Sequence, residues 1–590
     1  MQPADWVARA VDAERRGELL DAADLAERGL EEHPGNVSRQ YRSVLALARA
    51  GSTGEAAGRF AAYGLGELDD GEVQALGARI AKDVALGARG RERQRLALES
   101  AERYAAIFDR TGAYYPGVNA ATMHLVADRR SVSRSIASRV LDALAANGDG
   151  SYYAVATEAE ARLLLGDVER ARTALERAAE LGHDDHGAVA TTRRQLRLVL
   201  AHLDLEPEVL AVLGGPRVAH YCGHRVSVDR QGPLTSDTVA SAEAAIREEL
   251  ARNPVAYAYG SLASGADLLW AETLLATGAE LHVVLPFSRD EFVEASVADA
   301  GPEWVARFER CLGSASAVSY ATDDAFLGDD VLYRYGSELA MGLALLRGRF
   351  LEGEVMQLAL WDGAPARGGA GTAVDVETWR RAGRPVTLVP VAPASPSRPR
   401  PNPEPLPPRG RVVRALLFGD IQGFSKLSDE QLPRFAEHVL GAFAGVFSRH
   451  ADTISFRNTW GDGLYLVVEN TVAAARCALE LQETMASLDL DGNGLPEHLG
   501  LRLAAHVGPV FPLRDPVLGL ESFMGSHVSR TARVEPVTPP GCVYVTEPFA
   551  AALELASAAF ACDYVGHMPA AKDFGRLRMY RLRRAQRNEE

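Results

Sequence analysis

A proline-rich segment at residues 393–410, PASPSRPRPNPEPLPPRG, sets the main limit on how this chain can fold. Proline has no backbone N–H and fixes φ, so a run this rich in proline neither pairs into a sheet nor continues a helix. We expect an extended, semi-rigid linker that separates a carboxyl-terminal domain, residues 411–584, from everything before it. With 590 residues, the chain is long enough for several domains, each with its own core.

Composition and charge exclude several classes of protein. Apolar residues make up 47% and charged residues 24%, as in ordinary globular domains. The formal net charge is −16, so the whole chain is not attracted to nucleic acid or to an anionic membrane, and we expect neither as a partner. The five cysteines form no CxxC pair, which argues against a zinc site. Without a basic and apolar leader or an apolar run of about 18 residues, we expect a cytoplasmic protein.

Residues 1–205 have the pattern of nearly continuous amphipathic helix. Alanine, leucine, glutamate and arginine dominate, and apolar residues recur at helical spacing. Short breaks separate pairs of helices, with Gly17 and Gly166 between the members of two pairs. This pattern resembles tetratricopeptide-type helical hairpins, whose stacking buries a core that no single hairpin could bury. A structural scaffold and a surface that senses a protein partner or a ligand both stay open.

Residues 215–392 change to the pattern of an α/β domain. Helical segments such as residues 238–252 alternate with short apolar runs that end in turns. Those runs are RVAHYCGH (217–224), VAYAYGS (255–261), ELHVVLPF (280–287), QLALWDG (357–363) and PVTLVPV (385–391). The alternation predicts a doubly wound, Rossmann-like parallel sheet, in which ligands bind at the carboxyl ends of the strands.

Glycine-rich turns follow several of these runs. CGHR (222–225), GSLASGADLLWAE (260–272) and GGAGTA (368–373) would expose backbone N–H groups and helix starts, which favour a phosphate or another anion. The order resembles the SLOG superfamily of nucleotide-ligand sensor domains, and the resemblance implies a site for a nucleotide-derived ligand. GGAGTAVD only partly matches the signature of the phosphoribohydrolase branch, so we expect binding rather than hydrolysis, and turns without a ligand stay open. The implied ligand-binding residues are Arg225, Ser261, Gly265, Asp267, Gly371 and Thr372.

Two acidic residues stand out in the carboxyl-terminal domain. VVRALLFGDIQGFSKLSD (412–429) is an apolar strand that ends at Asp420, and SFRNTWGDGLYLVV (455–468) has the pattern of a hairpin with Asp462 at its tip. Aspartates at two strand ends can converge on a pair of divalent cations, and hard oxygen ligands suit Mg²⁺ or Mn²⁺. Two such ions can activate a hydroxyl group and stabilise a leaving phosphate. Turn caps without a metal are the structural alternative.

These motifs resemble the class III nucleotide cyclase catalytic domain, which has an α+β, ferredoxin-like fold. FGDIQGFS matches the first metal motif of the family and WGDG the second. MGSHVSRTARVEPVTPPGCVYVT (524–546) matches its glycine, helix and arginine segment, and AAKDFGRLRMYRL (570–582) its closing segment. Four motifs occur in the family's order, which makes the match specific.

The resemblance implies a role for each matching residue. Asp420, Asp462 and the backbone carbonyl of Ile421 would bind two metal ions. The 3′-oxygen of a nucleoside triphosphate would attack the α-phosphorus, and pyrophosphate would leave. Arg533 would stabilise charge on the transferring phosphoryl group, and Lys572 would bind phosphate. In the family the site is shared across a head-to-tail dimer, so we expect a homodimer through this domain.

Three positions depart from the family pattern. The base-reading positions hold Asn458 and Ser522, and an asparagine amide fits several base edges because it both donates and accepts hydrogen bonds. The position of a transition-state asparagine holds Ser529, whose hydroxyl is shorter. Family frequency favours ATP, while GTP and a pyrimidine triphosphate stay open.

We therefore expect three parts: helical repeats, an α/β sensor and a cyclase that makes a 3′,5′-cyclic nucleotide under their control. The rival hypotheses are a nucleotide-binding regulator without catalysis and a scaffold that recruits a protein partner through the helical repeats. A nucleotide sensor joined to a second-messenger enzyme would suit bacterial stress or antiviral defence signalling.

Overall fold

The computed structural model describes residues 3–227, 232–366, 368–391, 410–517, 519–572 and 575–585. They form two compact units. The first holds residues up to Pro216 together with Arg349–Gly353 and Asp563–Gly566, and the second holds the remainder of the chain. Apart from Gly410, the expected proline-rich linker lies outside the described residues.

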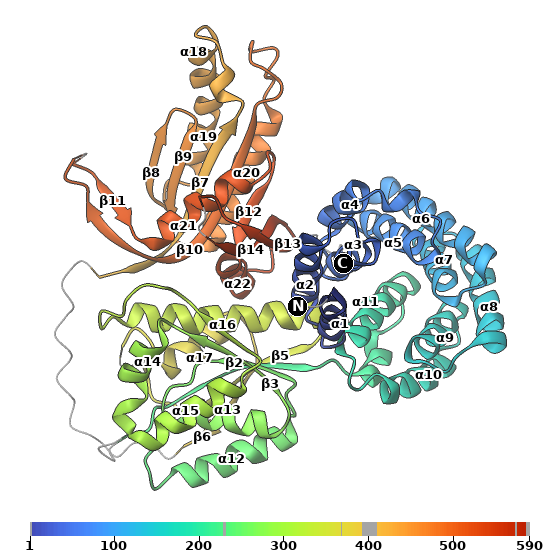
Figure 1. Cartoon of the computed structure of the whole chain (residues 1–590), viewed down its shortest axis with the longest axis horizontal. Coiled ribbons are helices and arrows are strands. Elements are labelled where there is room, and N and C mark those ends of the chain that lie inside the picture. Colours follow the sequence, from blue (N-terminus) through green and yellow to red (C-terminus); the bar gives the residue numbers. More distant parts are fainter. Residues whose placement is uncertain are drawn as a thin grey trace. The chain divides into compact units, whose positions relative to one another are not determined.

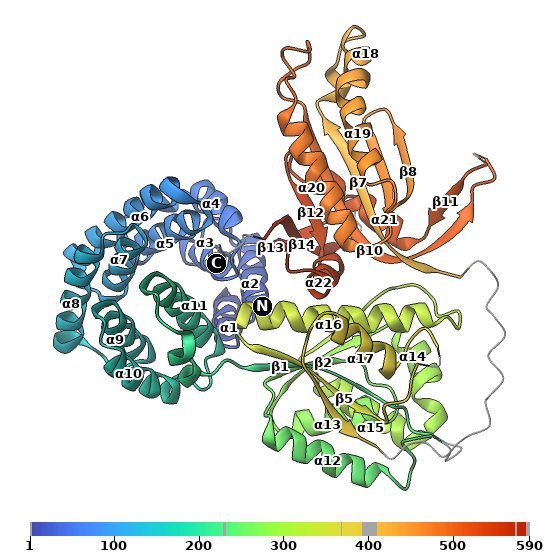
Figure 2. The ribbon, with the colours of Figure 1, turned by 180° about the vertical axis from the view of Figure 1, so that it is seen from behind.

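The first unit consists of helical hairpins, as the sequence pattern predicts. Figures 1 and 2 show a ring of helices, in which α3, α5, α9 and α11 lie on the inner side and α4, α6, α8 and α10 on the outer side. The helices are α1 (Pro3–Arg15), α2 (Leu19–Glu32), α3 (Val37–Arg49), α4 (Thr53–Ala62), α5 (Gly71–Gly87), α6 (Gly90–Thr111), α7 (Tyr114–Val126), α8 (Arg130–Asn147), α9 (Tyr152–Leu165), α10 (Val168–Leu181) and α11 (His186–Leu203).

Local signals explain where these helices begin and end. The Asn36 side chain caps α3 by accepting from the Arg39 N–H, and Asp167 caps α10 in the same way. Gly17 and Gly166 have φ of +72° and +87°, a conformation that favours glycine, at the turns within two hairpins. Buried alanines and leucines fill the space between hairpins, for example Ala159, Leu163 and Ala171. The predicted all-α, stacked-hairpin fold is confirmed.

The second unit begins with a six-stranded sheet in which every pairing is parallel. The strand order is β4-β3-β2-β1-β5-β6. The strands are β1 (Arg217–Gly223), β2 (Tyr257–Gly260), β3 (Glu280–Leu285), β4 (Ala317–Tyr320), β5 (Glu354–Trp361) and β6 (Val386–Pro390). The predicted doubly wound sheet is confirmed, and β4 is a strand that the sequence pattern missed.

Helices cover both faces of this parallel sheet. Figure 1 shows α12, α13 and α15 on one face and α16 and α17 on the other. The helices are α12 (Val239–Arg252), α13 (Ala266–Ala276), α14 (Arg289–Ser296), α15 (Pro302–Ser314), α16 (Asp330–Leu351) and α17 (Thr372–Arg381). The strand order reverses between β1 and β5, and in such sheets the crevice at the reversal is where ligands bind.

The second unit continues with a mixed sheet of the predicted α+β type. Its order is β13-β14-β12-β10-β7-β9-β8, and β11 pairs with an extension of β10. The strands are β7 (Val412–Gln422), β8 (Ile454–Trp460), β9 (Gly463–Val468), β10 (Gly500–Arg514), β11 (Glu521–Met524), β12 (Val543–Thr546), β13 (Phe560–Pro569) and β14 (Arg576–Arg584). The helices are α18 (Gln431–Phe435), α19 (Gly441–Arg449), α20 (Thr471–Ser487), α21 (Ser526–Val534) and α22 (Glu547–Ala556).

Strand alternation decides which face of the mixed sheet carries the acidic residue of β7. Leu416 and Phe418 pack in one cluster with Phe523 of β11 and Val528 of α21. Side chains two residues apart in a strand point to the same face, so Asp420 shares the face of Leu416 and Phe418. The first predicted metal ligand therefore faces the side of the sheet on which α21 and β11 lie.

The longest helices of the chain, α6 and α16, have 22 residues each. Among the described residues, no helix combines the length and the apolar character that a membrane crossing needs.

Candidate functional site

The two predicted metal ligands lie next to each other at one end of the mixed sheet. Asp420 lies near the end of β7, and Asp462 lies in the two-residue tip between β8 and β9. β7 pairs with β9 so that Gly419 lies opposite Leu464, which brings the tip beside Asp420. Burial raises the pKa of Asp462 to about 6, with smaller contributions from a hydrogen bond that the protonated Asp462 donates to Asp420 and from the charge of Asp420. The two carboxyl groups are therefore close enough that the negative charge on one disfavours ionisation of the other.

Two further ionisable residues complete this cluster, and the sequence reasoning missed both. Arg502 of β10 pairs with Asp420 across the sheet and forms an ion pair with its carboxylate. The same guanidinium lies 3.2 Å from Glu535, just after α21. Burial and, to a smaller extent, the charges of Asp420 and Asp462 raise the pKa of Glu535 to about 7, against the lowering effect of Arg502. Arg502 could have been noticed as a charged residue within the apolar run LRLAAHVG.

The donor set of this cluster fits divalent cations. Asp420 and Asp462 offer hard carboxylate oxygens, and Ile421 follows directly on β7 and can offer a backbone carbonyl. Burial is the main cause of the raised pKa of Asp462 and of Glu535, and the neighbouring carboxylates add a repulsion that bound cations would relieve. Arg502 supplies one positive charge at the same position.

A backbone hydrogen bond connects the segment of Arg533 with that of Lys572. Arg533 lies in the last turn of α21, and its backbone carbonyl accepts a hydrogen bond of 3.0 Å from the N–H of Ala571. Lys572 follows Ala571, is exposed, and has φ of +59°. Ser529, one turn before Arg533, is also exposed. Within the described residues, none of the three side chains forms a hydrogen bond or an ion pair with Asp420 or Asp462.

The predicted base-binding residues lie on two neighbouring strands. Asn458 on β8 is exposed, and its side-chain oxygen accepts from the N–H of Thr459 at 2.9 Å. Ser522 on β11 is half-buried and pairs with Leu513 of β10. The ring of Phe456 lies 6.5 Å from that of Phe523, which connects the two strands. The two strands are thus neighbours, but Ser522 points to the opposite face of β11 from Phe523.

Helix α21 also contacts the loop that follows β4 of the parallel sheet, within the same unit. Ser526 donates to Asp324 at 2.7 Å, and Arg530 donates to Asp323 at 2.9 Å. The Nε2 atom of His527 lies 2.9 Å from the hydroxyl of Thr322. Successive turns of the helix that carries Ser529 and Arg533 are therefore bound by one loop of the α/β domain.

A buried pair of histidines continues this connection into the mixed sheet. The rings of His506 on β10 and His527 are stacked with centroids 5.0 Å apart, and their nitrogens lie 2.7 Å apart. His506 also lies 2.6 Å from the hydroxyl of Thr546 on β12. Burial lowers the pKa of His527 to about 3 and that of His506 well below its usual value. Both rings therefore remain neutral near pH 7 and connect the strands by hydrogen bonds.

The parallel sheet has its own cavity, of about 380 Å³, at the carboxyl ends of its strands. Five of the six predicted sensor residues line it: Arg225, Ser261, Asp267, Gly371 and Thr372. The sixth, Gly265, forms a bridge with Arg225 and starts α13 with φ of +107°. A Cβ atom at Gly265 would lie 2.4 Å from the backbone nitrogen of Val226, so the close approach of these two loops requires glycine.

Two acidic side chains line this cavity, which a site for phosphate alone would not contain. Burial raises the pKa of Asp267 to about 7, and burial together with the charge of Asp267 raises the pKa of Asp375 to about 8. Asp375 accepts a hydrogen bond of 3.3 Å from Ser337 on α16. Arg225 is exposed, and its guanidinium donates to Asp299 at 2.6 Å. The cavity thus combines a basic residue at its rim with acids inside, which suits a ligand with hydrogen-bond donors as well as an anionic end.

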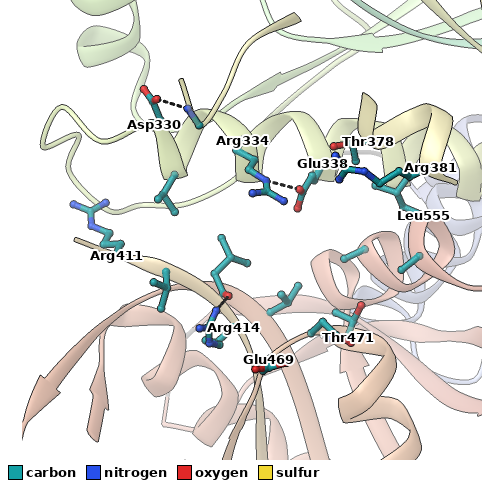
Figure 3. Close-up of a pocket in the computed structure, with 18 of the residues that line it drawn as sticks. Asp330, Arg334, Glu338, Thr378, Arg381, Arg411, Arg414, Glu469, Thr471 and Leu555 are labelled. Atoms are coloured by element: carbon teal, nitrogen blue, oxygen red, sulfur yellow. Dashed lines mark hydrogen bonds and ion pairs between the residues drawn. The ribbon is translucent and has the colours of Figure 1, made fainter. Parts of the chain in front are cut away.

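Helix α16 lines a second cavity with its other side. Figure 3 shows Arg334 and Glu338 of α16 opposite Arg414 of β7 and Glu469, around a space of about 630 Å³. Arg334 donates to Glu338 at 2.8 Å. The hydroxyl of Tyr335, on the same helix, donates to the carbonyl of Val507 on β10 at 3.0 Å. One helix therefore contacts both the sensor cavity and the mixed sheet.

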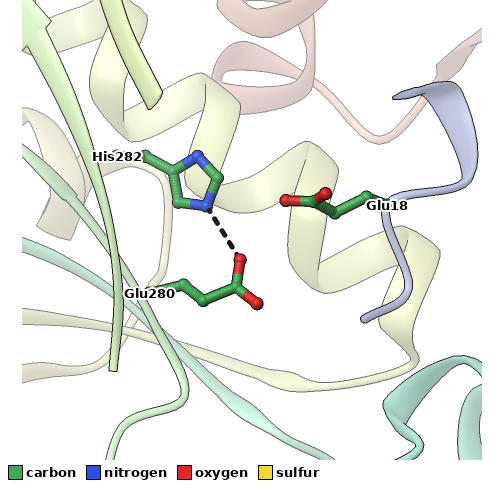
Figure 4. A group of neighbouring side chains, drawn as sticks. All are labelled: Glu18, Glu280 and His282. Atoms are coloured by element: carbon green, nitrogen blue, oxygen red, sulfur yellow. Dashed lines mark ion pairs between the residues drawn. The ribbon is translucent and has the colours of Figure 1, made fainter. Parts of the chain in front are cut away.

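A further pair of ionisable residues lies on β3, outside the sensor cavity. Figure 4 shows His282 facing Glu280, with 3.8 Å between the imidazole and the carboxylate. The His282 ring stacks on Tyr259 at 4.6 Å, and Arg347 of α16 lies 3.4 Å from its Nε2 atom. These contacts join β2, β3 and α16.

Comparison with known proteins gives a family for part of the first unit. The sequence profile of the family described as Tetratricopeptide Repeats-Sensor (TPR-S) matches residues 18–124. Among curated protein sequences, no significant match was found.

The carboxyl-terminal part is similar to solved nucleotide cyclases. The adenylyl cyclase CyaB from P. aeruginosa is 16% identical, and the match covers 31% of this chain and 99% of that chain at a TM-score of 0.28. The guanylate cyclase domain of RhGC from Catenaria anguillulae, in complex with GTP, is 17% identical over 30% and 97% of the two chains, with a TM-score of 0.26. Adenylate cyclases from Trypanosoma brucei in their monomeric state are 20% identical over 29% and 87%, also at 0.26. These identities and scores are too low to transfer a substrate or an activity.

Proposed function

We propose that this chain is a nucleotide cyclase that converts a nucleoside triphosphate into a 3′,5′-cyclic nucleotide and pyrophosphate. The observation that carries the proposal is the convergence of Asp420 and Asp462, which raises the pKa of Asp462 through burial and through the neighbouring carboxyl group. The four ordered sequence motifs supply the second support. ATP is the first substrate to test, followed by GTP and the pyrimidine triphosphates.

In the proposed reaction, the 3′-oxygen loses its proton and forms a bond to the α-phosphorus, while the bond from that phosphorus to the pyrophosphate oxygen breaks. Asp420, Asp462 and the Ile421 carbonyl would hold two Mg²⁺ or Mn²⁺ ions. Such ions lower the pKa of the hydroxyl and neutralise the triphosphate when they are bound. Arg533 would donate hydrogen bonds to the transferring phosphoryl group, Ser529 would add one more, and Lys572 would bind phosphate. Asn458 and Ser522 would contact the base.

The active form in this proposal is a homodimer. Ser529, Lys572 and Asn458 are exposed in the single chain, as expected of residues that complete a site only against a second copy. The hairpin between β10 and β11 carries exposed apolar side chains, including Val517, Leu520 and Met524. Large exposed apolar side chains gathered in one segment are typical of interaction surfaces. A site shared between two chains requires a second copy of this chain, and this hairpin offers a surface for it.

The other two parts would regulate the cyclase. We assign residues 1–205 to a helical sensor or partner-binding domain, 215–392 to a nucleotide-ligand sensor domain and 411–584 to the cyclase domain. The contacts of α21 with Thr322, Asp323 and Asp324 support this role, because a ligand that moves this loop also moves the helix of Ser529 and Arg533. Helix α16 offers a second connection, since it lines the sensor cavity and donates to Val507.

The test is mass spectrometry of the products formed by the purified chain. ATP, GTP, CTP and UTP are supplied in turn, each with Mg²⁺ or Mn²⁺. We expect one cyclic product, and we expect Asp462→Asn to lower its rate by about three orders of magnitude, because the metal arrangement is worth several kcal/mol of transition-state stabilisation. Asp452→Asn, at an exposed aspartate near β8, is the matched control and should retain activity.

A nucleotide-binding regulator without catalysis is the second candidate. The ion pair between Arg502 and Asp420 favours it, because a guanidinium at that carboxylate competes with a cation for the same oxygens. Ser529 in place of a longer donor favours it too. This candidate predicts that a triphosphate binds in the presence of metal and that no cyclic product forms with any of the four nucleotides, which would contradict the cyclase proposal.

A further inference from the structure

The inner face of the helical ring contains a cavity of about 770 Å³. It lies entirely within the first unit and is lined by residues from α3, α5, α7, α9 and α11, together with the end of α6. Figures 1 and 2 show α3, α5, α9 and α11 on the inner side of the ring. Alternate helices of the stacked hairpins thus direct side chains to one place, and the volume lies in the range of small-molecule sites.

Tyrosines make up much of the wall of this inner cavity. Tyr41 comes from α3, Tyr114 and Tyr115 from α7, and Tyr153 from α9. Tyr115 and Tyr153 are 41% and 42% exposed, although both lie on the concave face of a folded domain. Edge-on contacts hold their rings in place, with Tyr104 at 6.4 Å from Tyr115 and Tyr152 at 5.4 Å from Tyr153. The cavity therefore presents fixed aromatic surface to a ligand.

Two arginines add positive charge to the same wall. Arg79 of α5 is about nine-tenths buried, and its nearest carboxylate, that of Asp83, lies 3.7 Å away. Arg49 of α3 forms an ion pair of 2.7 Å with Glu14. In the described part of the chain, the Nε atoms of Arg49 and Arg79 are buried without a hydrogen-bond partner. Buried donors of this kind are costly unless a ligand or water satisfies them.

The described acidic residues that line the cavity do not pair with Arg49 or Arg79. Asp70 caps α5 by accepting from the N–H groups of Glu72 at 2.9 Å and Val73 at 3.0 Å, so its carboxylate is already used. Glu72 remains as an acceptor, suited to a hydroxyl or an amino group of a ligand. Also on α5, the buried Lys82 donates to Asn119 and Gln195, each at 2.9 Å. The buried lysine is thus part of the scaffold, and the tyrosine rings and the Nε atoms of Arg49 and Arg79 are the groups left for binding.

We propose that this inner cavity binds a nucleoside phosphate, with the base on the rings of Tyr115 and Tyr153 and the phosphate at Arg49 and Arg79. Aromatic rings stack on any base, and a planar guanidinium donates paired hydrogen bonds to phosphate oxygens. Convergence on one compact cavity suits a small molecule better than an extended peptide. The proposal does not depend on the cyclase activity, since every residue it uses lies in α3, α5, α7 and α9.

Photoaffinity labelling of the full chain locates such a ligand directly. 8-Azido-ATP and 8-azido-cAMP are irradiated with the protein in EDTA, which prevents metal-dependent binding elsewhere, and the labelled peptides are identified by mass spectrometry. We expect label on the peptides that contain Tyr115 or Tyr153, and we expect unlabelled AMP to compete with it. Label found only beyond residue 215, or nowhere, would overturn the proposal.

Variants separate binding from folding in the same experiment. Combining Tyr153→Ser with Arg79→Gln should reduce labelling in the helical unit at least tenfold while leaving any label beyond residue 215 unchanged. Tyr153→Phe keeps the ring and should retain labelling, and Arg103→Gln, at an exposed arginine of α6, is the charge-matched control. Circular dichroism verifies that the helices remain folded. Labelling that the double variant does not reduce would contradict the assigned site.

Discussion

The two sheets of the second unit carry candidate sites of opposite character. In the parallel sheet, five of the six predicted sensor residues line a cavity of about 380 Å³, and Asp267 and Asp375 are held inside it. In the mixed sheet, Asp420 and Asp462 converge, whereas Ser529, Lys572 and Asn458 remain exposed. Residues of one chain enclose the cavity of the parallel sheet, whereas a second copy would have to complete the proposed cyclase site.

This difference follows from how each sheet is connected. Crossover helices bring all the carboxyl ends of a parallel sheet to one edge, so loops distant in sequence enclose a cavity in a single chain. An antiparallel hairpin such as β8–β9 instead ends in a tip that crossover helices do not enclose, so a second chain can reach it. The comparison implies that ligand binding at the sensor cavity should not depend on protein concentration, while catalysis should.

Among the variants that test this difference, we expect the largest effect on activity from a change at Arg533. Replacing Arg533 with Gln keeps a polar side chain of similar length but removes the charge that would stabilise the transferring phosphoryl group. We expect the rate of cyclic product formation to fall about 100-fold, with little change in nucleotide binding. Steady-state kinetics check this, with Arg476→Gln, at an exposed arginine of α20, as the control. An unchanged kcat would remove Arg533 from the site.

Burial of Asp375 in the enclosed cavity should make the free energy of unfolding depend on pH. The folded-state pKa of Asp375 is raised to about 8, so the folded chain binds a proton that the unfolded chain has released, and stability falls as pH rises from about 4 to 8. Asp375→Asn removes this dependence. We expect the variant to gain about 4 kcal/mol relative to the original chain on going from pH 5 to pH 8.

Thermal unfolding of both proteins at the two pH values measures this gain. Asp323→Asn, at an exposed aspartate of the same unit, should show no such gain. A parallel pH dependence in the original chain and in Asp375→Asn would mean that the cavity does not hold Asp375 in its protonated form.

A smaller effect of opposite sign is expected at the histidine pair. The folded-state pKa of His527 is lowered to about 3, so its contribution to stability is present above the unfolded pKa of about 6.5 and is lost as pH falls below it. Lowering the pH from 7 to 5 should cost about 2 kcal/mol through this group. His527→Asn should reduce the pH dependence of unfolding over that range, and an identical slope in the two proteins would contradict the assignment.

Much of the fold could be predicted from hydrophobic periodicity. The change from helical spacing to short apolar runs near residue 215 marks where the parallel sheet begins. β4 was missed because its four residues are all exposed at the edge of the sheet, so they show no apolar contrast. β11 was not predicted as a strand either, and only Ser522 within it was named, as a base-reading position of the family.

The candidate site was only partly predictable. Asp420 and Asp462 lie in motifs that are local in sequence, so their spacing could be read directly. Arg502 and Glu535 reach them through the pairing of β10 with β7 and through the end of α21, which depend on contacts distant in sequence. The acidic interior of the sensor cavity was not expected either, because Asp375 follows the glycine-rich turn and becomes buried only when α17 packs beside α16.

Mixing two inactive variants tests most directly whether the proposed cyclase site is shared between two chains. Asp462→Asn lacks a metal ligand and Arg533→Gln lacks the phosphoryl-binding arginine, so each homodimer has two defective sites. In an equal mixture, half of the dimers combine the two variants, and each of these has one intact site. We expect the mixture to recover roughly a quarter of the original activity. A mixture no more active than the sum of its two components would contradict a site shared between chains.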